Sequence, residues 1–248
     1  MFFDDHRRFL ESSDTASDLA RLNLRHEAII VDNADILRGA RVLDIASHDG
    51  RWTFAALKCG ATHITSVEGR QHLVEHTRRN LAAEGIDPSA YELRQSDIFR
   101  ELASGGIRVN VVLCLGFLYH TLRYNELLHG MWLTGAKYII LDTTVILGTK
   151  PMIKVIQDKN KIEANAVPDD YSVGSRNLVG IPSTAALRPM FDAYGYGFDR
   201  QYDWPALLAR QPKTTAAADY AASRRVTIRW KRRAALPGIG QRRPGRNS

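Results

Sequence analysis

Short runs of apolar and β-branched residues alternate with helical patterns along most of the chain. The runs that predict strands cover residues 41–46, 63–68, 91–95, 109–115, 137–143, 196–202 and 224–230. The apolar spacing predicts helices at about 14–36, 53–58, 71–84, 124–133 and 183–194. Such alternation is typical of βαβ units. We therefore expect an α/β fold with a doubly wound, seven-stranded and mostly parallel sheet.

Two connections are longer than the others. Residues 147–180 separate the fifth strand from the next helix, and long insertions at the carboxyl ends of strands usually form lids or substrate walls. Residues 205–223 join the last two strands without an obvious crossover helix, which permits an antiparallel hairpin at the sheet edge. We therefore predict one domain over residues 1–233, with 147–180 as a lid and acceptor insertion.

The ends of the first three strands carry acidic residues. The first strand contains Asp44 and ends in the turn Ala-Ser-His-Asp-Gly (46–50), which passes directly into a helix. Open α/β sheets bind ligands next to such a turn, and an acid at the end of the second strand accepts hydrogen bonds from ribose hydroxyls. Glu68 has that place, 24 residues after Asp44, and Asp97 follows the third strand. Together they indicate a cofactor site, although each alone also suits a strand end, a solvent-facing carboxylate or a helix N-cap.

The residues of this turn indicate which cofactor binds. It lacks the dinucleotide fingerprint GxGxxG, which disfavours NAD and FAD. S-adenosylmethionine (SAM) has no pyrophosphate and needs only a close backbone approach to its methionine part. The turn resembles motif I of class I SAM-dependent methyltransferases, in which an acid is followed by three spaced glycines. Asp44 keeps the acid and Gly50 the last glycine, whereas Ala46 and His48 replace the first two.

This resemblance implies a Rossmann-like methyltransferase fold with SAM as the cofactor. Glu68, followed by Gly69, matches the acid of the second motif, which binds the ribose. Asp97 would meet the adenine amino group, and Ile98 would flank the adenine ring. The side chain of His48 would project over the loop and either narrow the site or reach the acceptor.

The fourth strand ends in Leu115 and Gly116, where a sheet of this kind reverses direction and faces the reactive group of the cofactor. Gly116 allows a close approach, and Tyr119 supplies a hydroxyl and a ring face. His120 supplies an imidazole that titrates near neutral pH and can remove a proton during methyl transfer. A histidine at a helix start also often bonds a nearby carbonyl. His120 is nevertheless our preferred base.

Asp142 lies in the sequence LDTT at the end of the fifth strand. It could orient His120, accept the proton of the acceptor, hold Mg²⁺ with His48 or Glu163, or simply end the strand. The sequence has no tight cluster of His and Cys, which argues against a zinc site.

Three blocks resemble the bacterial wobble-uridine tRNA (cmo5U) synthases, which use carboxy-SAM: LGFLYHTLRYNELL, YIILDTTVI and SRNLVGIPSTAALRPMFDAYGY. The similarity covers roughly residues 44–202. It implies that Tyr119 faces the transferred group, with Arg176 and Asn177 near the pocket. Motif I differs from that family, and an extended basic N-terminal domain that could grip tRNA is lacking. We therefore carry over the fold and the pocket geometry, and not the RNA substrate.

The loop DIASHDGRW, the size and the Arg-rich composition resemble a second group, the actinobacterial sugar O-methyltransferases of methylmannose polysaccharide synthesis. This resemblance implies a saccharide acceptor. A sugar pocket combines aromatic platforms with carboxylates and histidines. The chain could supply these from Tyr119, Tyr124, Tyr171, Trp204, His48, His120 and Asp142.

The positive charge is concentrated at one end of the chain. The 248 residues include 34 Lys and Arg against 27 Asp and Glu, a formal net charge of +7. Nine of the basic residues and no acid lie from Arg224 onward, so the preceding part has 25 basic and 27 acidic residues. We expect residues 234–248 to be a flexible basic tail rather than a specific RNA-binding element.

The remaining features indicate a cytoplasmic protein. No apolar run reaches the roughly 18 residues of a membrane span, and the first residues lack an apolar signal core. Cys59 and Cys114 both fall in segments predicted to be buried, so we expect no disulfide scaffold. A homodimer would be typical of small methyltransferases.

These observations favour a SAM-dependent O-methyltransferase that acts on a hydroxyl of a small, sugar-like acceptor. A tRNA-modifying enzyme is the alternative suggested by the family blocks and the Arg-rich end, and it predicts strongly salt-dependent tRNA binding. A non-catalytic SAM-binding protein is the third hypothesis, because motif I is degenerate.

Overall fold

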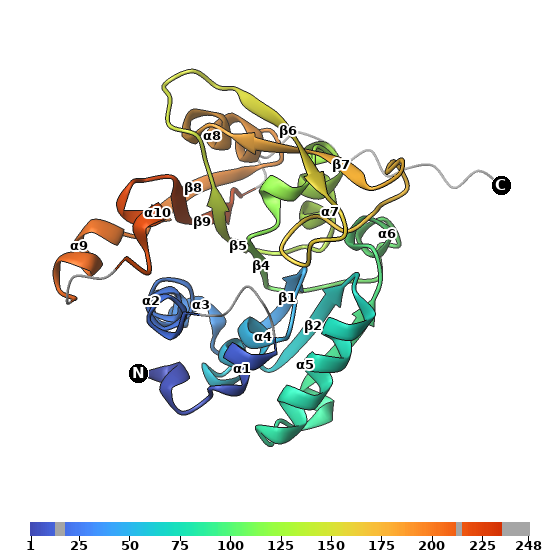
Figure 1. Ribbon diagram of the computed structural model, residues 1–248, viewed down its shortest axis with the longest axis vertical. Coiled ribbons are helices and arrows are strands. Elements are labelled where there is room, and N and C mark those ends of the chain that lie inside the picture. The colour runs from blue at the N-terminus through green and yellow to red at the C-terminus, as the bar shows by residue number, and fades with distance from the viewer. Residues whose placement is uncertain (13–17, 212–214, 235–248) are drawn as a thin grey trace.

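The computed structural model describes residues 1–12, 18–211 and 215–234, and its centre is a sheet of seven strands (Figure 1). The strand order is β3-β2-β1-β4-β5-β9-β8. The strands are β1 (Arg41–Ile45), β2 (His63–Glu68), β3 (Tyr91–Gln95), β4 (Val111–Leu115), β5 (Tyr138–Thr144), β8 (Tyr196–Gln201) and β9 (Arg225–Arg232). β1 to β5 are parallel, and β9 is antiparallel to β5 and β8. The predicted α/β fold and edge hairpin are confirmed.

Helices cover both faces of this sheet, because successive strand residues point to opposite sides. In β4, Val112 and Cys114 belong to one apolar core, whereas Val111 and Leu113 belong to the other. The first core contains residues of α6 (Ile98–Ala103), α7 (Tyr124–Leu133) and α8 (Thr184–Asp192). The second contains residues of α1 (Arg8–Glu11), α2 (Leu19–Ile29), α3 (Ala34–Leu37), α4 (Arg51–Lys58) and α5 (Gln71–Ala83).

The segment predicted as a lid contains an antiparallel hairpin of β6 (Ile153–Lys159) and β7 (Arg176–Pro182). In Figure 1 this hairpin, drawn in yellow (β6) and orange (β7), lies beyond the carboxyl ends of the parallel strands. The backbone N–H of Gly180 donates to the carbonyl of Thr121, which joins β7 to the segment after β4. Neither β6 nor β7 was predicted from the sequence, and most residues of β6 are exposed. We call residues 147–180 the lid.

Several short helices were also missed. α6 follows Asp97, and α9 (Trp204–Ala209) and α10 (Ala218–Ala221) lie in the connection before β9. None of these three exceeds six residues, which is too short for a helical period to be recognised. Single 3₁₀ turns complete the described elements: η1 (Phe2–Asp4), η3 (Val31–Asn33), η4 (Pro88–Ala90) and η5 (Leu118–His120).

Three other predictions concern the whole chain. Within the described residues, no helix has the length and apolar character needed to cross a membrane. Cys59 and Cys114 are free thiols. The predicted basic tail, 234–248, lies outside the described residues except for Ala234.

Candidate functional site

A cavity of about 900 Å³ opens at the carboxyl ends of the parallel strands. This is near the upper end of the roughly 300–1,000 Å³ of small-molecule sites. Ten of the residues predicted to bind the cofactor or to act in catalysis line it: Ala46, His48, Glu68, Gly69, Asp97, Ile98, Leu115, Gly116, Tyr119 and His120. Asp44, Gly50 and Asp142 are buried and are not among the described residues of its wall.

The loop between β1 and α4 keeps a glycine-like backbone although two of its motif I glycines are replaced. Ala46, His48 and Gly50 have φ angles of 52°, 57° and 82°. A left-handed conformation costs a non-glycine residue roughly 1–2 kcal/mol. Glu68 accepts a hydrogen bond from the N–H of His48 at 3.0 Å, and the Thr77 hydroxyl donates to the His48 carbonyl at 2.9 Å. These contacts hold the turn in the shape that three glycines would give it.

Gly50 is packed so closely that a side chain there should disrupt this loop. A Cβ atom at Gly50 would lie 2.5 Å from Cγ2 of Thr77, at a φ of +82°. We expect Gly50→Ala to lower the free energy of unfolding by about 2–4 kcal/mol, through backbone strain and overpacking together. It should also weaken SAM binding about tenfold or more, because the loop lines the cavity. Chemical denaturation and SAM titration calorimetry measure the two effects.

Gly85→Ala is the matched control for this variant. Gly85 has a φ of +67°, but nothing lies within 4 Å of its Cβ position. Its substitution should cost about 1 kcal/mol and leave SAM binding unchanged. Equal losses in the two variants would contradict the role of packing against Thr77.

Asp44 supports the loop from beneath. It is 1% exposed, and the hydroxyl of Thr53 donates to it at 2.8 Å. The hydroxyls of Thr53 and Ser66 are 2.6 Å apart, so this chain of contacts joins β1, α4 and β2. Burial raises the pKa of Asp44 to about 7. A direct contact between Asp44 and SAM stays a prediction.

Glu68 and Asp97 line one half of the cavity from the ends of β2 and β3. Glu68 accepts hydrogen bonds from the backbone N–H groups of His48 and Arg70 at 3.0 and 2.9 Å. Burial raises the pKa of Glu68, although these N–H groups oppose the shift. Asp97 caps α6 by accepting from the N–H of Phe99 at 2.7 Å. Because a carboxylate has about four acceptor positions, both acids can still bind a ligand.

Arg123, which the sequence did not single out, joins this half of the cavity to the lid. Its guanidinium lies 3.8 Å from the ring centroid of Phe99 and 4.9 Å from that of Tyr171 in the lid. It also lies 3.7 Å from Asp97 and 3.5 Å from Asp169. These contacts bring an aromatic lid residue close to the predicted adenine position.

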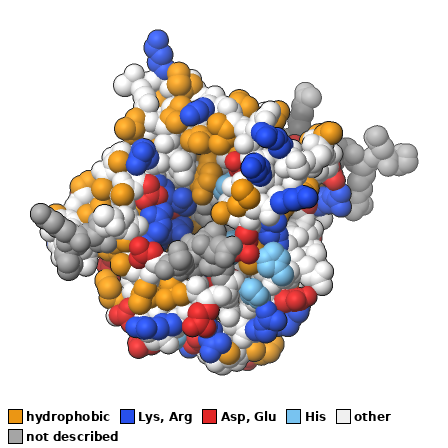
Figure 2. Space-filling view, viewed as in Figure 1, with side chains coloured by type: hydrophobic (Ala, Val, Ile, Leu, Met, Phe, Trp, Pro, Cys, Tyr) orange, Lys and Arg blue, Asp and Glu red, His pale blue; other side chains and the backbone are white. Residues whose placement is uncertain are grey.

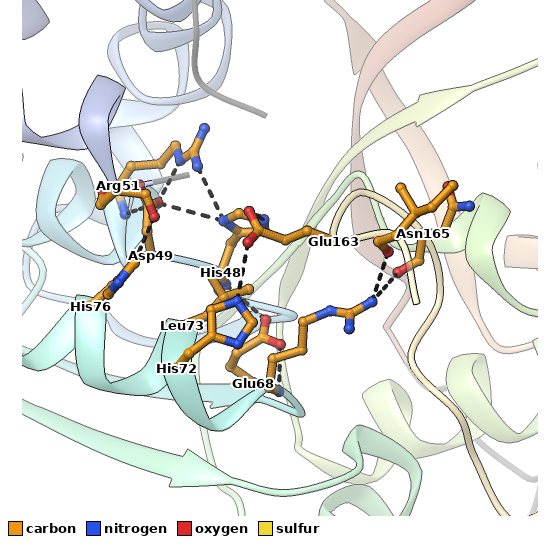
Figure 3. Close-up of polar contacts among 12 residues, drawn as sticks. His48, Asp49, Arg51, Glu68, His72, Leu73, His76, Glu163 and Asn165 are labelled. Carbon is orange, nitrogen blue, oxygen red and sulfur yellow. Dashed lines mark hydrogen bonds and ion pairs between the residues drawn. The ribbon is translucent and has the colours of Figure 1, made fainter. Parts of the chain in front are cut away.

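Two further side chains hold the lid over the half of the cavity that Glu68 and Asp97 line (Figure 3). The guanidinium of Arg70 donates at 2.9–3.4 Å to three lid carbonyls, those of Asn160, Ile162 and Asn165. Glu163 points from the lid toward His48 and His72, with N···O distances of 3.6 and 3.1 Å. Burial lowers the pKa of His48 to about 4, so the ring is neutral at pH 7. His48 therefore narrows the cavity as an uncharged side chain.

His120 lies in the other half of the cavity, after β4, and its carboxylate partner is Asp158 in the lid. Nδ1 of His120 is 3.2 Å from Oδ2 of Asp158. When Nδ1 donates to this carboxylate, Nε2 is the nitrogen that accepts a proton. Burial lowers the pKa of His120, and the Asp158 carboxylate opposes this shift. The sequence indicated His120 but not Asp158, which is 38 positions away on β6.

The structure corrects the expectation that Asp142 acts beside His120. Asp142 is 0% exposed, and its Oδ1 contacts Nε and Nη2 of Arg225 at 2.6 Å and Nη2 of Arg25 at 3.2 Å. Its Oδ2 accepts from two hydroxyls at 2.7–2.8 Å, those of Thr227 and Tyr220. Burial alone would raise the pKa of Asp142, but these groups lower it to about 2.

Asp142 also does not fit the Mg²⁺ site considered from the sequence. Mg²⁺ requires oxygen ligands with an open octahedral arrangement, whereas the oxygens of Asp142 are occupied by two cationic groups and two hydroxyls. His48 and Glu163 contact each other instead, with an N···O distance of 3.6 Å. In the part of the chain that the structure describes, no group of three His, Cys, Asp or Glu residues is arranged to hold a metal.

The aromatic residues considered for a sugar pocket divide into two groups. Tyr119 and Tyr171 line the cavity. Tyr124 is buried and donates to a carbonyl of β7, and Trp204 is buried with its ring stacked 3.6 Å from that of Tyr220. The interpretation of Tyr124 and Trp204 as sugar platforms was therefore wrong. Two lid residues implied by the family resemblance do line the cavity, Arg176 and Asn177.

Besides Arg70 and Arg123, four further arginines that line the cavity were not singled out from the sequence: Arg21, Arg25, Arg51 and Arg225. They come from α2, the start of α4 and the start of β9. Figure 2 shows Lys and Arg side chains gathered in the recess beside α10. Because the contributing segments are far apart in the chain, no local sequence pattern reveals this cluster.

No protein-family model matches the chain, and no curated protein matches it. Among solved structures, the N-terminal domain of EvdMO1 in the presence of SAH and D-fucose has a TM-score of 0.60, with 19% identity over 90% of this chain and 84% of that one. The CcbJ methyltransferase from Streptomyces caelestis has a TM-score of 0.53, with 17% identity over 86% and 90%. A putative SAM-dependent methyltransferase from Listeria monocytogenes has a TM-score of 0.55, with 11% identity over 86% and 99%.

All three similar structures are less than 25% identical to the chain, so the likeness concerns the fold. It agrees with five parallel strands that reverse order between β1 and β4 and end in an antiparallel hairpin. The chain therefore has the fold of the class I SAM-dependent methyltransferases.

Proposed function

We propose that the protein is a SAM-dependent O-methyltransferase that transfers a methyl group to a hydroxyl of a small, sugar-like acceptor. The observation that carries the proposal is one cavity with two different halves. Glu68 and Asp97 line the half that suits a nucleoside, and His120 lies in the half that suits a hydroxyl acceptor. The N-terminal domain of EvdMO1, which is similar in fold, was crystallised in the presence of SAH and D-fucose, and this supports both assignments.

The residues of the first half fit SAM. Glu68 would accept hydrogen bonds from the ribose hydroxyls and Asp97 from the adenine amino group, with Ile98 against the adenine ring. The turn at Ala46 and the end of β4 at Gly116 would lie against the methionine part. Gly116 has a φ of 89°, which leaves its backbone open to a close approach.

The second half supplies a base. Bound SAM carries a methyl group that is already activated, so the chain has to position the acceptor and take up its proton. Nε2 of His120 would accept the hydroxyl proton as the O–CH₃ bond forms and the S–CH₃ bond of the sulfonium breaks, which would leave SAH. Asp158, on Nδ1, holds the ring and stabilises the imidazolium that forms. Because burial lowers the pKa of His120, the ring is neutral and ready to accept a proton at pH 7.

Asp158→Asn should change the pH dependence of this step. The Asp158 carboxylate raises the pKa of His120 against the lowering effect of burial, so its loss should lower that pKa further. Since the base must be neutral, the acid limb of kcat/KM should move to lower pH. The plateau of kcat should also fall, because the imidazolium loses its counter-charge. A pH profile identical to the wild type would mean that Asp158 only packs the lid.

Transfer of a labelled methyl group from SAM tests the proposed function. Purified protein is incubated with labelled SAM and fractionated cell extract, and then with D-fucose and other simple sugars. We expect label in the carbohydrate or small-molecule fraction that survives ribonuclease and a metal chelator. Label destroyed by ribonuclease would favour the tRNA-modifying alternative. SAM binding without transfer would favour a non-catalytic protein. Repeating the assay with carboxy-SAM as the donor shows whether the group transferred is methyl or carboxymethyl.

A further inference from the structure

Arg25 shares its carboxylate with another arginine. Nη2 of Arg25 lies 3.2 Å from Oδ1 of Asp142, the same oxygen that Arg225 contacts at 2.6 Å through Nε and Nη2. The other oxygen of Asp142 already accepts two hydroxyl hydrogen bonds. Among the described residues, the two guanidinium groups of Arg25 and Arg225 therefore share the single carboxylate of Asp142.

The two neighbouring arginines each have an acidic partner. Arg21 contacts both oxygens of Asp219 at 2.6 and 2.7 Å, and Arg51 contacts Asp49 at 2.6 Å. By contrast, Nε of Arg25 is buried and has no hydrogen-bond partner among the described residues. Burying a cation without a full counter-charge is costly. An anionic ligand would supply what Arg25 lacks.

The position of Arg25 indicates that this anionic ligand is the acceptor and not the cofactor. The guanidinium of Arg25 lies 5.0 Å from the ring centroid of Trp52 and contacts Asp142 on β5. Glu68, the predicted ligand of the cofactor ribose, lies at the end of β2. β2 and β5 are three strands apart in the sheet, which corresponds to about 14 Å. The side chain of Arg25 is only 12% exposed, so solvent screens its attraction for an anion weakly.

We propose that the acceptor is acidic and carries a carboxylate or phosphate group that binds Arg25, with Arg225 beside it. A guanidinium matches the geometry of these two groups and binds them more strongly than a neutral hydroxyl. A sugar acid or a sugar phosphate has such a group, whereas a neutral sugar leaves the second guanidinium without a counter-charge. This inference rests on the proposed function, since it names the class of acceptor for the same cavity.

Binding to the protein saturated with SAH tests the inference without requiring turnover. The probes are glucuronate, glucose 1-phosphate and the neutral sugar D-fucose, titrated by calorimetry. At low salt we expect at least one acidic probe to bind about tenfold more tightly than D-fucose, with a preference that weakens as salt is added. The tighter of the two acidic probes identifies the group as a carboxylate or a phosphate. Equal affinities for acidic and neutral probes would overturn the proposal.

Variants of Arg25 test whether this side chain causes the preference for acidic probes. Arg25→Gln should abolish it and Arg25→Lys should keep part of it, while SAH affinity changes by less than about threefold. Arg78→Gln, at an exposed position of α5, is the control and should bind like the wild type. If Arg25→Gln weakened SAH binding and kept the preference, Arg25 would bind the cofactor carboxylate and the proposal would be wrong. A wild-type protein that does not bind SAH would contradict the proposed function instead.

Discussion

Replacing His120 by alanine should lower kcat by about 10²- to 10⁴-fold, the usual contribution of a positioned general base. SAM affinity should stay unchanged, because the predicted cofactor acids Glu68 and Asp97 come from other strands. Steady-state kinetics with the acceptor found by the transfer assay measures the first effect, and calorimetry with SAM measures the second.

His129→Ala is the matched control for this variant. His129 lies on α7 at an exposed position and is not among the described residues that line the cavity. Its substitution should leave both kcat and SAM affinity at the wild-type level. Full turnover by His120→Ala at saturating SAM would rule out His120 as the base, and an equal loss in both variants would point to a general effect on the fold.

The sheet could be predicted because most of its strands are buried on both faces. All five residues of β4 are buried, and such an apolar run is recognisable whatever packs against it. The observed ends of the seven strands differ from the predicted ends by no more than two residues. β6 differs, because most of its residues are exposed and it pairs only with β7. Its strand conformation depends on pairing with residues 17 to 29 positions further along the chain, and not on local burial.

The candidate site could be predicted only where the topology fixes a position. Glu68 ends β2 and Asp97 follows the end of the adjacent parallel strand β3 by two residues, so the fold itself brings them to one edge. Asp142 ends β5 and looks equivalent in the sequence, yet its carboxylate is enclosed by Arg25 and Arg225. These arginines are 117 and 83 positions away along the chain. In the sequence, a carboxylate that binds a ligand looks the same as one that pairs with side chains inside the protein. Only partners far away along the chain distinguish the two.

The loop after β1 keeps a glycine-like backbone although its residues differ from those of motif I. Ala46 and His48 depart from the glycines of motif I, and this departure was the reason for the hypothesis of a non-catalytic SAM-binding protein. Their φ angles of 52° and 57° are nevertheless those that glycine adopts easily. Contacts from Glu68 and Thr77 to His48 hold this conformation. The backbone shape therefore depends on neighbours as well as on residue type.

Replacing Asp142 by alanine should lower the free energy of unfolding by about 3–5 kcal/mol, because two guanidinium groups would remain in place without a carboxylate. The side chains of Arg225 and Arg25 are 8% and 12% exposed, so water cannot replace the lost partner well. Denaturant unfolding measures the change. Asp170→Ala is the control, since the pair of Asp170 with Arg100 is exposed and screened by solvent, so its loss should change stability little.

The same variant should also change stability at acid pH. The folded protein lowers the pKa of Asp142 from 3.8 to about 2, so the stability that its charge provides is fully present above the higher value. That stability is lost as the pH falls from about 4 toward 2. The wild type should therefore lose more stability over this range than Asp142→Ala, which has already lost the charge. If Asp142→Ala instead kept wild-type stability and lost methyl transfer, the carboxylate would act on the acceptor, and the buried network would not be its main role.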